Sequence, residues 1–372
     1  AAQPAARARH FGPQSLAFTA WAFASRAVDN GPLMDSIASE SLRTLGGWCE
    51  SAGSGSKPVD TVLALVESLA EAGHLEAPVV DAATVALQRH GVSLDRAHAA
   101  PAGGAEAGEW THAALAQGAD DEPYALLVQP RLCVLWKPRG WSVTVADDTG
   151  GFQAEQPRSG GSGGRPLQDW LERKVAADCA IARDRAVSQG LVHRLDRDTS
   201  GALLWANCYS GFYAARLQLR ARRMRKEYLC LCWGRVERLC VLDSPLLKVE
   251  RVAGFPRSVP DPRGRVARTE LCALSHLRAP DGEEVSLLRV RIHTGRLHQI
   301  RAHLCHAGHP LVGDVLYGDA SPDWCPQLFL HACRIALDIG DGPIDLEVPL
   351  PSELAAALRA LEPVQGPSRG LW

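Results

Sequence analysis

Apolar residues recur at intervals of three and four positions through most of the first hundred residues. The positions that follow this spacing are Leu16, Ala20, Phe23, Leu33, Ile37, Val62, Leu65, Leu69, Val80, Ala83 and Leu87. Because an α-helix turns once in about 3.6 residues, residues at this spacing lie on one helix face, which can pack against a core. The pattern predicts helices from residue 13 to about residue 98.

The two halves of this helical segment are similar. PQSLAFTAWAFA and then PLMDSIASESL in the first half correspond to PVDTVLALVESLAEAG and then APVVDAATVALQRHG in the second. Each half gives a helix, a break and a second helix, and the offset between the halves is about 45 residues, within the range of helical repeats. The sequence predicts about two helical-hairpin repeats over residues 1–98, stacked as a short solenoid.

Short apolar segments separated by turn residues follow from residue 124 onward. The segments typical of strands are 125–128, 132–136, 141–145, 202–206, 227–236, 269–277 and 284–292, and helices are expected over 166–177 and 209–224. Many short strands, few helices and no regular alternation of the two favour an α+β domain with a mostly antiparallel, mixed sheet. We expect this domain to span residues 124–361.

Two polar stretches separate or interrupt these regions. Residues 99–123 are rich in Ala, Gly and acids, which is typical of a linker. Residues 147–165, DDTGGFQAEQPRSGGSGGR, are too rich in Gly to pack and are expected to form a flexible insertion. Residues 362–372 are expected to form a tail.

The composition, with 46% hydrophobic and 22% charged residues, is that of an ordinary globular protein. No apolar run approaches the length of a membrane span, so no membrane partner is expected. The net charge of −2 is unevenly divided: residues 1–120 hold 7 basic and 13 acidic side chains, and the remainder hold 33 and 29. The segment 216–226, RLQLRARRMRK, carries six basic side chains and no acid. Such a run is typical of phosphate contact, and a solvated helix face is the alternative.

The eleven cysteines occur singly apart from Cys230 and Cys232, and none forms a C-x-x-C pair. This favours reduced thiols in an intracellular protein over a disulfide framework or structural zinc. The chain starts without Met, at AAQPAARARH, so we expect a fragment or a processed form. The Arg-bearing, Ala-rich start leans toward plastid or mitochondrion, with cytoplasm and nucleus left open.

A charged loop, GLVHRLDRDTSG at residues 190–201, lies between two apolar segments. Asp196 is near its middle, and Thr199, Ser200 and Gly201 are residues typical of a turn. A loop between buried strands is a usual place for a reactive group, because the strands fix a loop that still reaches solvent. The alternative is a surface turn that Asp196 merely caps.

A second segment with candidate chemistry spans residues 292–318, IHTGRLHQIRAHLCHAGHPLVGDVLYG. It predicts a helix from about Thr294 to Gly308. The apolar stripe expected to face the core consists of Leu297, Ile300, Leu304 and Ala307. Arg301 lies on the neighbouring stripe, where its guanidinium can form a two-pronged pair with a carboxylate.

Four histidines crowd this second segment, which makes a metal site the competing interpretation. They are His298, His303, His306 and His309. No two of them have the i, i+4 spacing that places ligands on one helix face, and no H-E-x-x-H motif is present. We therefore expect no metal, and histidines that pack or contact nucleic acid.

In their order along the chain, these motifs resemble those of RluA-type pseudouridine synthases. The matching segments are LCVLWKPRGWSV (132–143), HRLDRDTSG (193–201), RKEYLCLCWG (225–234), ARTELCAL (267–274), TGRLHQIRAHLCHAGHPLVGDVLYG (294–318) and LHACRIAL with LEVPLP (330–351). HRLD-x-x-TSG together with TGR-x-HQIR is highly specific for the family. The resemblance covers residues 124–361. It departs from the family at Trp136, where a small or polar residue is usual, in the long insertion, and in lacking a recognisable preceding RNA-binding domain.

The resemblance implies an isomerase that converts uridine to pseudouridine in RNA and needs no cofactor. The N1–C1′ bond breaks, the base turns, and C5 joins C1′. The resemblance assigns Asp196 as nucleophile or base beside C1′ and Arg301 as the partner that keeps this carboxylate ionised. It assigns Tyr228 to stack on the target base and take the C5 proton. Arg194 matches the residue that enters the helix stack when the base flips out.

The remaining substrate-binding residues implied are contacts to the RNA. They are His193, Arg296, His298, Arg222, Arg223 and Arg225. The partner is therefore RNA, with ribosomal, transfer and messenger RNA left open, and the protein is expected to be a monomer.

Two alternative functions stay open on the sequence: an RNA-binding or RNA-folding factor with vestigial catalysis, and a metal-dependent hydrolase built on the histidines. The first helical copy, SLAFTAWAFA, resembles octatricopeptide-type repeats of organellar RNA-binding proteins. The acidic balance of that segment leaves a protein-contacting or purely structural role equally open.

Overall fold

The computed structural model describes residues 11–25, 28, 30–48, 57–99, 115, 121–145, 165–176, 179–250, 256–318 and 321–364. Most of the expected linker at 99–123, nearly all of the expected insertion at 147–165 and the end of the expected tail lie outside the described residues.

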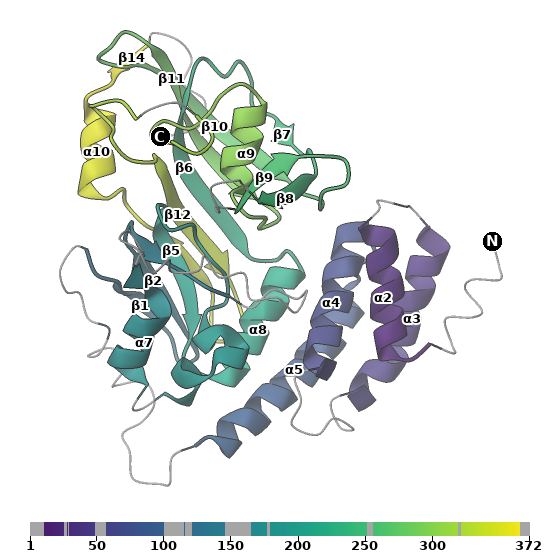
Figure 1. Ribbon diagram of the computed structural model, residues 1–372. Coiled ribbons are helices and arrows are strands. Elements are labelled where there is room, and N and C mark those ends of the chain that lie inside the picture. Colours follow the sequence, from purple (N-terminus) through teal and green to yellow (C-terminus); the bar gives the residue numbers. More distant parts are fainter. Residues whose placement is uncertain are drawn as a thin grey trace.

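The first hundred residues are helical where they are described, as the apolar spacing predicts. The helices are α2 (Pro13–Ala24), α3 (Gly31–Trp48), α4 (Lys57–Ala72) and α5 (Ala77–Ala97). α2 packs along α4 and α3 packs along α5, so the two hairpins lie side by side (Figure 1). Leu16, Ile37 and Leu65 are fully buried in this packing. The likeness to octatricopeptide repeats stays a prediction.

The helical segment contacts the rest of the chain through α8 (Tyr209–Arg220), beside which α4 and α5 lie in Figure 1. Gly91 of α5 is the point of closest approach, since an added Cβ atom would lie 2.5 Å from the Cα atom of Ser210. Asp95 accepts hydrogen bonds from the backbone amides of Tyr209 (2.7 Å) and Ser210 (3.1 Å). A carboxylate of α5 thereby caps the N-terminus of α8.

The strands form a mixed sheet that has ten strands within the described residues, in the order β1-β2-β5-β12-β6-β11-β10-β14, with β13 beside β12 and β7 beside β10. Their bounds are β1 Tyr124–Val128, β2 Leu132–Lys137, β5 Ser200–Ala206, β6 Arg225–Trp233, β7 Val241–Leu242, β10 Thr269–Arg278, β11 Glu284–Ile292, β12 Leu330–Leu337, β13 Ile344–Glu347 and β14 Glu362–Pro363. The pairings are antiparallel apart from β5 with β12, which is parallel. The predicted α+β class with a mostly antiparallel sheet is confirmed.

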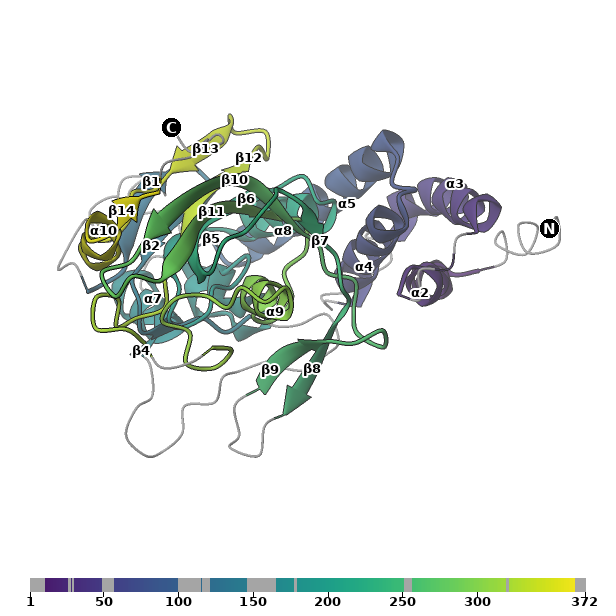
Figure 2. The same cartoon turned by 90° about the horizontal axis from the view of Figure 1, so that it is seen from above.

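Smaller elements surround this sheet. Two-stranded sheets pair β3 (Trp141–Ser142) with β4 (Arg165–Pro166), and β8 (Leu246–Glu250) with β9 (Pro256–Pro260). The β8–β9 hairpin projects from the domain near α9 (Gln299–His306), as Figure 2 shows. The other helices are α7 (Leu167–Val175), α10 (Ser352–Arg359) and two 3₁₀ segments, Ala180–Arg183 and Arg185–Gly190.

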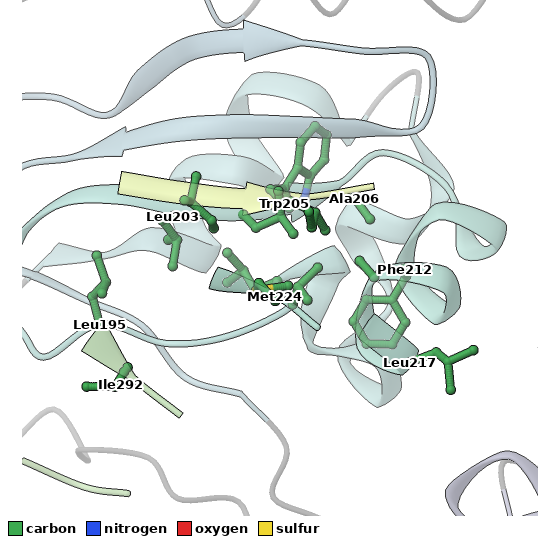
Figure 3. Packing of buried hydrophobic residues seen from close by; sticks show 14 of the residues in the cluster. Leu195, Leu203, Trp205, Ala206, Phe212, Leu217, Met224 and Ile292 are labelled. Atoms are coloured by element: carbon green, nitrogen blue, oxygen red, sulfur yellow. The ribbon is translucent and has the colours of Figure 1, made fainter. Parts of the chain in front are cut away.

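The core lies against the centre of the sheet and anchors the charged loop. β2 and β5 are buried along their whole lengths, as their continuous apolar runs predict. Leu195, inside the loop, is also buried. Figure 3 shows it in the same cluster as Trp205 of β5, Phe212 of α8 and Ile292 at the end of β11. The loop that carries Asp196 is therefore held at Leu195 by apolar packing within this cluster.

Several boundaries differ from the sequence prediction. The helix expected over 209–224 ends at Arg220, because Arg222 adopts a left-handed backbone (φ 57°), and β6 then begins at Arg225 instead of 227. The helix expected from Thr294 begins at Gln299, because His298 is also left-handed (φ 49°), and Ala307 is exposed and not in the core. Residues 362–364, expected in the tail, join the sheet through β14 and β10.

Candidate active site

A cavity of about 400 Å³ opens beside the charged loop. Its walls come from segments far apart in the sequence: α4, the loop before β5, the turn after α8, β6, the β8–β9 hairpin and the segment between β11 and α9. Asp196, Tyr228 and Arg301 all line it. The structure thus brings together the three residues that the sequence predicts to be catalytic.

A buried lysine, Lys137, holds the loop around Asp196 through hydrogen bonds to its backbone. The ammonium of Lys137, which is fully buried, donates hydrogen bonds to the carbonyl oxygens of Arg197 (3.1 Å) and Thr199 (2.7 Å). It also donates to the carbonyl of the neighbouring Pro138 (3.1 Å), and the Thr199 amide donates to the Asp196 carbonyl (3.1 Å). These bonds satisfy buried carbonyls and hold the turn that presents Asp196.

Arg301 faces Asp196 because a second carboxylate orients it. Asp314 accepts two hydrogen bonds from the Arg301 guanidinium, from Nε and from Nη2, each 2.7 Å long. The remaining nitrogen, Nη1, lies 3.6 Å from Oδ2 of Asp196. Asp314 and Arg301 are both buried. The planar guanidinium is thereby locked between two carboxylates, a geometry that a lysine ammonium does not provide.

The electrostatic surroundings keep Asp196 ionised. Burial raises the pKa of its carboxyl, but the attraction of His298, Arg301, Arg194 and Lys137 outweighs burial, so that the pKa lies below its ordinary value. The side chain retains 16% exposure, on the cavity side. Asp196 is therefore a charged carboxylate presented to whatever occupies the cavity.

His298 and Tyr317 complete the surroundings of this carboxylate. Nε2 of His298 lies 4.0 Å from Oδ2 of Asp196, and its Nδ1 lies 3.3 Å from the Tyr317 hydroxyl. The Tyr317 ring lies beneath the Arg301 guanidinium, 5.1 Å from ring centre to Cζ. Burial lowers the pKa of His298 more strongly than Asp196 raises it, so this imidazole holds a proton less readily than an ordinary histidine.

Tyr228 reaches the cavity because strand residues alternate between the two faces of a sheet. Along β6, Lys226 and Tyr228 line the cavity and Glu227 lies on the opposite face. Burial and the charge of Asp196 both raise the pKa of the Tyr228 hydroxyl. The hydroxyl is therefore a protonated phenol at neutral pH.

Three of the arginines predicted to contact substrate also line the cavity: Arg194, Arg222 and Arg296. Arg296 donates from Nε to the Val266 carbonyl (2.9 Å) and from Nη2 to Glu71 of α4 (2.6 Å). Arg194 contributes to lowering the Asp196 pKa. The placement of these residues agrees with their predicted contact with substrate, which stays a prediction.

Three other residues predicted to contact substrate lie where a phosphate contact is not favoured. His193 lines the cavity, but it accepts a hydrogen bond from the Leu204 amide (3.2 Å), and burial lowers its pKa to about 3, so it carries no positive charge. Arg225 pairs with Glu227 on the opposite face of β6, because the strand alternates. Arg223 is exposed but is not part of the cavity wall.

Sequence patterns did not identify Asp314, Lys137, Glu67 and Glu71 as site residues. Asp314 lies in the segment 292–318, where a lone acid among apolar residues was the available signal. Lys137 lies just after the predicted strand 132–136, whereas in the structure it ends the buried strand β2. Glu67 and Glu71 are four residues apart on α4, and no local pattern connects them to a site near Asp196.

The histidines of the segment 292–318 have separate hydrogen-bond partners where these are described. No group of three or more His, Cys, Asp or Glu side chains among the described residues is arranged to hold a metal ion. His303 bonds to Thr269 (2.9 Å) and His309 to the Trp233 carbonyl (3.0 Å), and His306 is exposed. Of the helices that the structure describes, none has the length and apolar character needed to cross a membrane.

Comparison with known proteins gives one consistent family. Residues 131–306 match the family model described as RNA pseudouridylate synthase. An uncharacterized RNA pseudouridine synthase of Chloroflexus aurantiacus is 41% identical over 203 residues, which cover 54% of this chain and 62% of the relative. Ribosomal large subunit pseudouridine synthase D of Nitrosomonas europaea is 37% identical over 184 residues, which cover 46% of this chain and 51% of the relative.

Among solved structures, human RNA pseudouridylate synthase domain containing 4 is similar, with 21% identity and a TM-score of 0.47 over 64% of this chain and 93% of that chain. The chain spans 62% and 51% of the lengths of the two curated relatives. The matched region holds Asp196, Tyr228 and Arg301. Residues 131–306 are therefore similar to RNA pseudouridylate synthases.

Proposed function

We propose that this protein is an isomerase that converts uridine to pseudouridine in RNA at the cavity around Asp196. The observation that carries the proposal is a carboxylate kept ionised in a largely buried site by Arg301, which Asp314 holds in place. Burying an ion pair costs free energy, because both charges lose their hydration. We do not expect this cost to be retained in a site that has lost its catalysis.

The reaction rearranges one nucleotide and consumes no other reactant. The N1–C1′ bond of the uridine breaks, the freed base turns within the cavity, C5 bonds to C1′, and the hydrogen of C5 is lost while N1 takes up a proton. Asp196 acts at C1′ as nucleophile or at the sugar as base, and either role requires the ionised carboxylate. Arg301 maintains that charge while the carboxylate is shielded from water.

Tyr228 has two roles in this proposal. Its ring stacks on the uracil, which keeps the detached base in the cavity while it turns. Because its pKa is raised, the phenol starts protonated. It therefore takes the C5 proton while its own proton passes to solvent, and N1 takes up one proton from solvent, so that no net proton is gained or lost. The phenol is a weak proton acceptor, and the restored aromaticity of the uracil ring provides the driving force for the transfer.

The substrate has to present a uridine outside the RNA stack. Flipping a base out of a stack costs a few kcal/mol, and Arg194 lies at the cavity to fill the space that the base leaves. The names of the bacterial relatives make large-subunit ribosomal RNA the first substrate to test. Since one chain supplies Asp196, Tyr228 and Arg301, we infer that a monomer is sufficient.

Tritium release from RNA labelled at uridine C5 tests the proposal. We expect release by the native protein and a fall of about 10³-fold or more in the Asp196→Asn variant. Asp198→Asn is the matched control, because Asp198 lies two residues away in the same loop and contacts Arg139 (3.9 Å) and Arg197 (3.4 Å) at the surface. It should retain full activity.

Failure of the native protein to release tritium from total RNA and from ribosomal RNA would refute the isomerase proposal. Equal release by native protein and Asp196→Asn would also refute it. Tight RNA binding without any release would favour the RNA-binding alternative.

A further inference from the structure

Helix α4 presents an acidic face to the basic wall of the cavity. Asp60, Glu67 and Glu71 are spaced by seven and four residues, so they lie within about 40° of one another around the helix. This face points toward α8 and the turn after it, which hold most of the basic run 216–226. The acidic excess before residue 120 and the basic excess after it therefore meet where the acidic face of α4 contacts the basic wall.

Glu71 binds two arginines of the cavity wall. Its Oε1 accepts a hydrogen bond from Nη2 of Arg296 (2.6 Å) and lies 3.4 Å from Nη2 of Arg222. Only 8% of the Glu71 side chain is exposed, and 13% of the Arg296 side chain. Both arginines are among the residues expected to bind the RNA backbone.

Glu67 binds the same wall one helical turn earlier. Its carboxylate forms an ion pair with Arg220 and lies 3.8 Å from Arg265 and 3.8 Å from Arg296. Burial raises the pKa of Glu67, but Arg220, Arg296 and Arg265 together hold it below its ordinary value. The carboxylate is therefore charged in the folded protein.

The two glutamate carboxylates present negatively charged oxygen acceptors to these arginines, as the phosphates of an RNA backbone do. Guanidinium groups bind carboxylates and phosphates through the same planar pairs of N–H donors. Arg220, Arg222, Arg265 and Arg296 all line the cavity that holds Asp196. Lys226, on the same wall, lies close enough to Arg220 and Arg296 that burial and these charges lower its pKa to about 8. Without the glutamates the wall would carry a larger excess of positive charge.

We propose that α4 is an autoinhibitory element in which Glu67 and Glu71 occupy two phosphate positions on the basic wall. RNA binds this wall fully only when α4 moves aside. This proposal rests on the proposed function, because it takes RNA as the ligand of the cavity. The alternative is a permanent structural contact, in which the ion pairs only hold α4 to the domain.

The decisive variant is the double substitution Glu67→Gln with Glu71→Gln, which preserves size and removes both charges. RNA affinity is measured by fluorescence anisotropy from 50 to 300 mM KCl. We expect binding on the order of 10-fold tighter at the lowest salt. The plot of log affinity against log salt should also steepen by about 1.4 to 1.8, the change expected when the protein neutralises two more phosphates.

The matched control is Glu76→Gln with Asp81→Asn. Both residues are exposed and lie in the same helical segment. The control removes two negative charges, as the Glu67/Glu71 variant does. The control should leave the slope of the salt plot unchanged. If the Glu67/Glu71 variant has the same slope as this control, or binds RNA more weakly than the native protein, α4 is not an RNA mimic.

A second variant separates displacement from loss of charge. Gly91→Leu adds a side chain where even a Cβ atom would lie 2.5 Å from the Ser210 backbone, so α5 has to move away from α8. It keeps both glutamates and retains helix propensity. We expect the same steeper salt dependence, with helix content by circular dichroism unchanged. A Gly91→Leu protein of unchanged helix content and unchanged slope would contradict the proposal.

The two proposals fail in different ways. RNA binding does not require turnover, so a steeper slope without tritium release from any RNA refutes the isomerase and keeps α4 as a competitor for RNA. Normal tritium release with an unchanged slope in both variants refutes the autoinhibitory contact alone.

Discussion

Asp314 holds the guanidinium of Arg301 by two hydrogen bonds of 2.7 Å and leaves its third nitrogen 3.6 Å from Asp196. The predicted catalytic carboxylate therefore depends on a second carboxylate that touches no substrate. Because Asp314 fixes the plane of the guanidinium, the direction from which Asp196 is stabilised is set before RNA binds. In the proposed reaction Asp314 is a positioning residue.

Asp314→Asn should lower kcat by about 10²-fold, because a misplacement of about 1 Å at a catalytic group has this effect. RNA affinity should change little, since Asp314 does not line the cavity. Tritium release at saturating RNA, with a separate binding titration, measures the two effects. Asp345→Asn, which breaks a surface pair with Arg334 (2.6 Å), is the control. An unchanged kcat in Asp314→Asn would contradict the positioning role.

Lys137→Met should destabilise the protein and slow the reaction. The variant leaves the buried carbonyl of Thr199 without its Lys137 donor, and an unsatisfied buried group costs about 1–3 kcal/mol. The Arg197 carbonyl also loses Lys137 but keeps the hydrogen bond from the Gly140 amide (2.8 Å). Urea unfolding measures the loss, and tritium release shows whether the Asp196 loop is disturbed. Lys174→Met, at an exposed position of α7, should lie within about 0.5 kcal/mol of the native protein. Equal stability of the two variants would show that Lys137 does not hold the loop.

Tyr228→Phe separates stacking from proton transfer. The ring remains, so we expect RNA affinity close to that of the native protein. Loss of the hydroxyl should lower kcat by about 10² to 10⁴-fold, the usual range for a general acid–base group. Pseudouridine formation is measured by quantitative mass spectrometry of digested RNA. If kcat is unchanged, Tyr228 only stacks, and another group accepts the C5 proton.

Gly201→Ala should be far more damaging than Gly140→Ala, although both glycines have positive φ (120° and 86°). A Cβ atom at Gly201 would lie 2.3 Å from the Ala332 carbonyl oxygen, where β5 pairs with β12. A Cβ atom at Gly140 would have no neighbouring heavy atom within 4 Å. We expect a loss of at least about 3 kcal/mol at Gly201 and about 1 kcal/mol at Gly140. Thermal unfolding of both variants distinguishes them, and similar Tm values would contradict the close approach.

Buried neutral histidines should make the protein less stable in mild acid. His331 is fully buried, bonds to Ser200 (3.0 Å) and the Val348 carbonyl (3.1 Å), and burial lowers its pKa to about 4. Below the ordinary histidine pKa of about 6.5, the unfolded chain binds a proton that the folded chain does not. The free energy of unfolding therefore falls as pH drops from about 6.5 toward about 4, by up to about 1.4 kcal/mol per pH unit for this group.

Urea unfolding at pH 4.5, 5.5, 6.5 and 7.5 checks this. His331→Gln should flatten the pH dependence below pH 6.5. His306→Gln, at an exposed position, should leave it unchanged. Parallel curves for His331→Gln and the native protein would show that His331 does not carry this effect.

The elements that the sequence predicted well are those whose signal is local. The helices from Pro13 to Ala97 and the buried strands β2 and β5 follow from apolar spacing within single segments. Asp196, Tyr228 and Arg301, which the structure brings to one cavity, were predicted as site residues because each lies in a motif of fixed spacing. Two predicted helix boundaries were wrong because Arg222 and His298 have positive φ angles, which interrupt a helix. The sequence does not signal these angles, since neither arginine nor histidine requires a left-handed backbone.

By itself the sequence determined the fold class and the opposite charge excesses in the two parts of the chain, and it predicted Asp196 and Arg301 as site residues. Only the tertiary structure decided which charges meet. Arg225 and Lys226 are neighbours in one basic run, yet strand alternation sends them to opposite faces. Glu71 and Arg296 are 225 residues apart and lie 2.6 Å from each other. Ion pairs form over a few ångströms, and that distance depends on how α4, β6 and α9 pack, which no local pattern encodes.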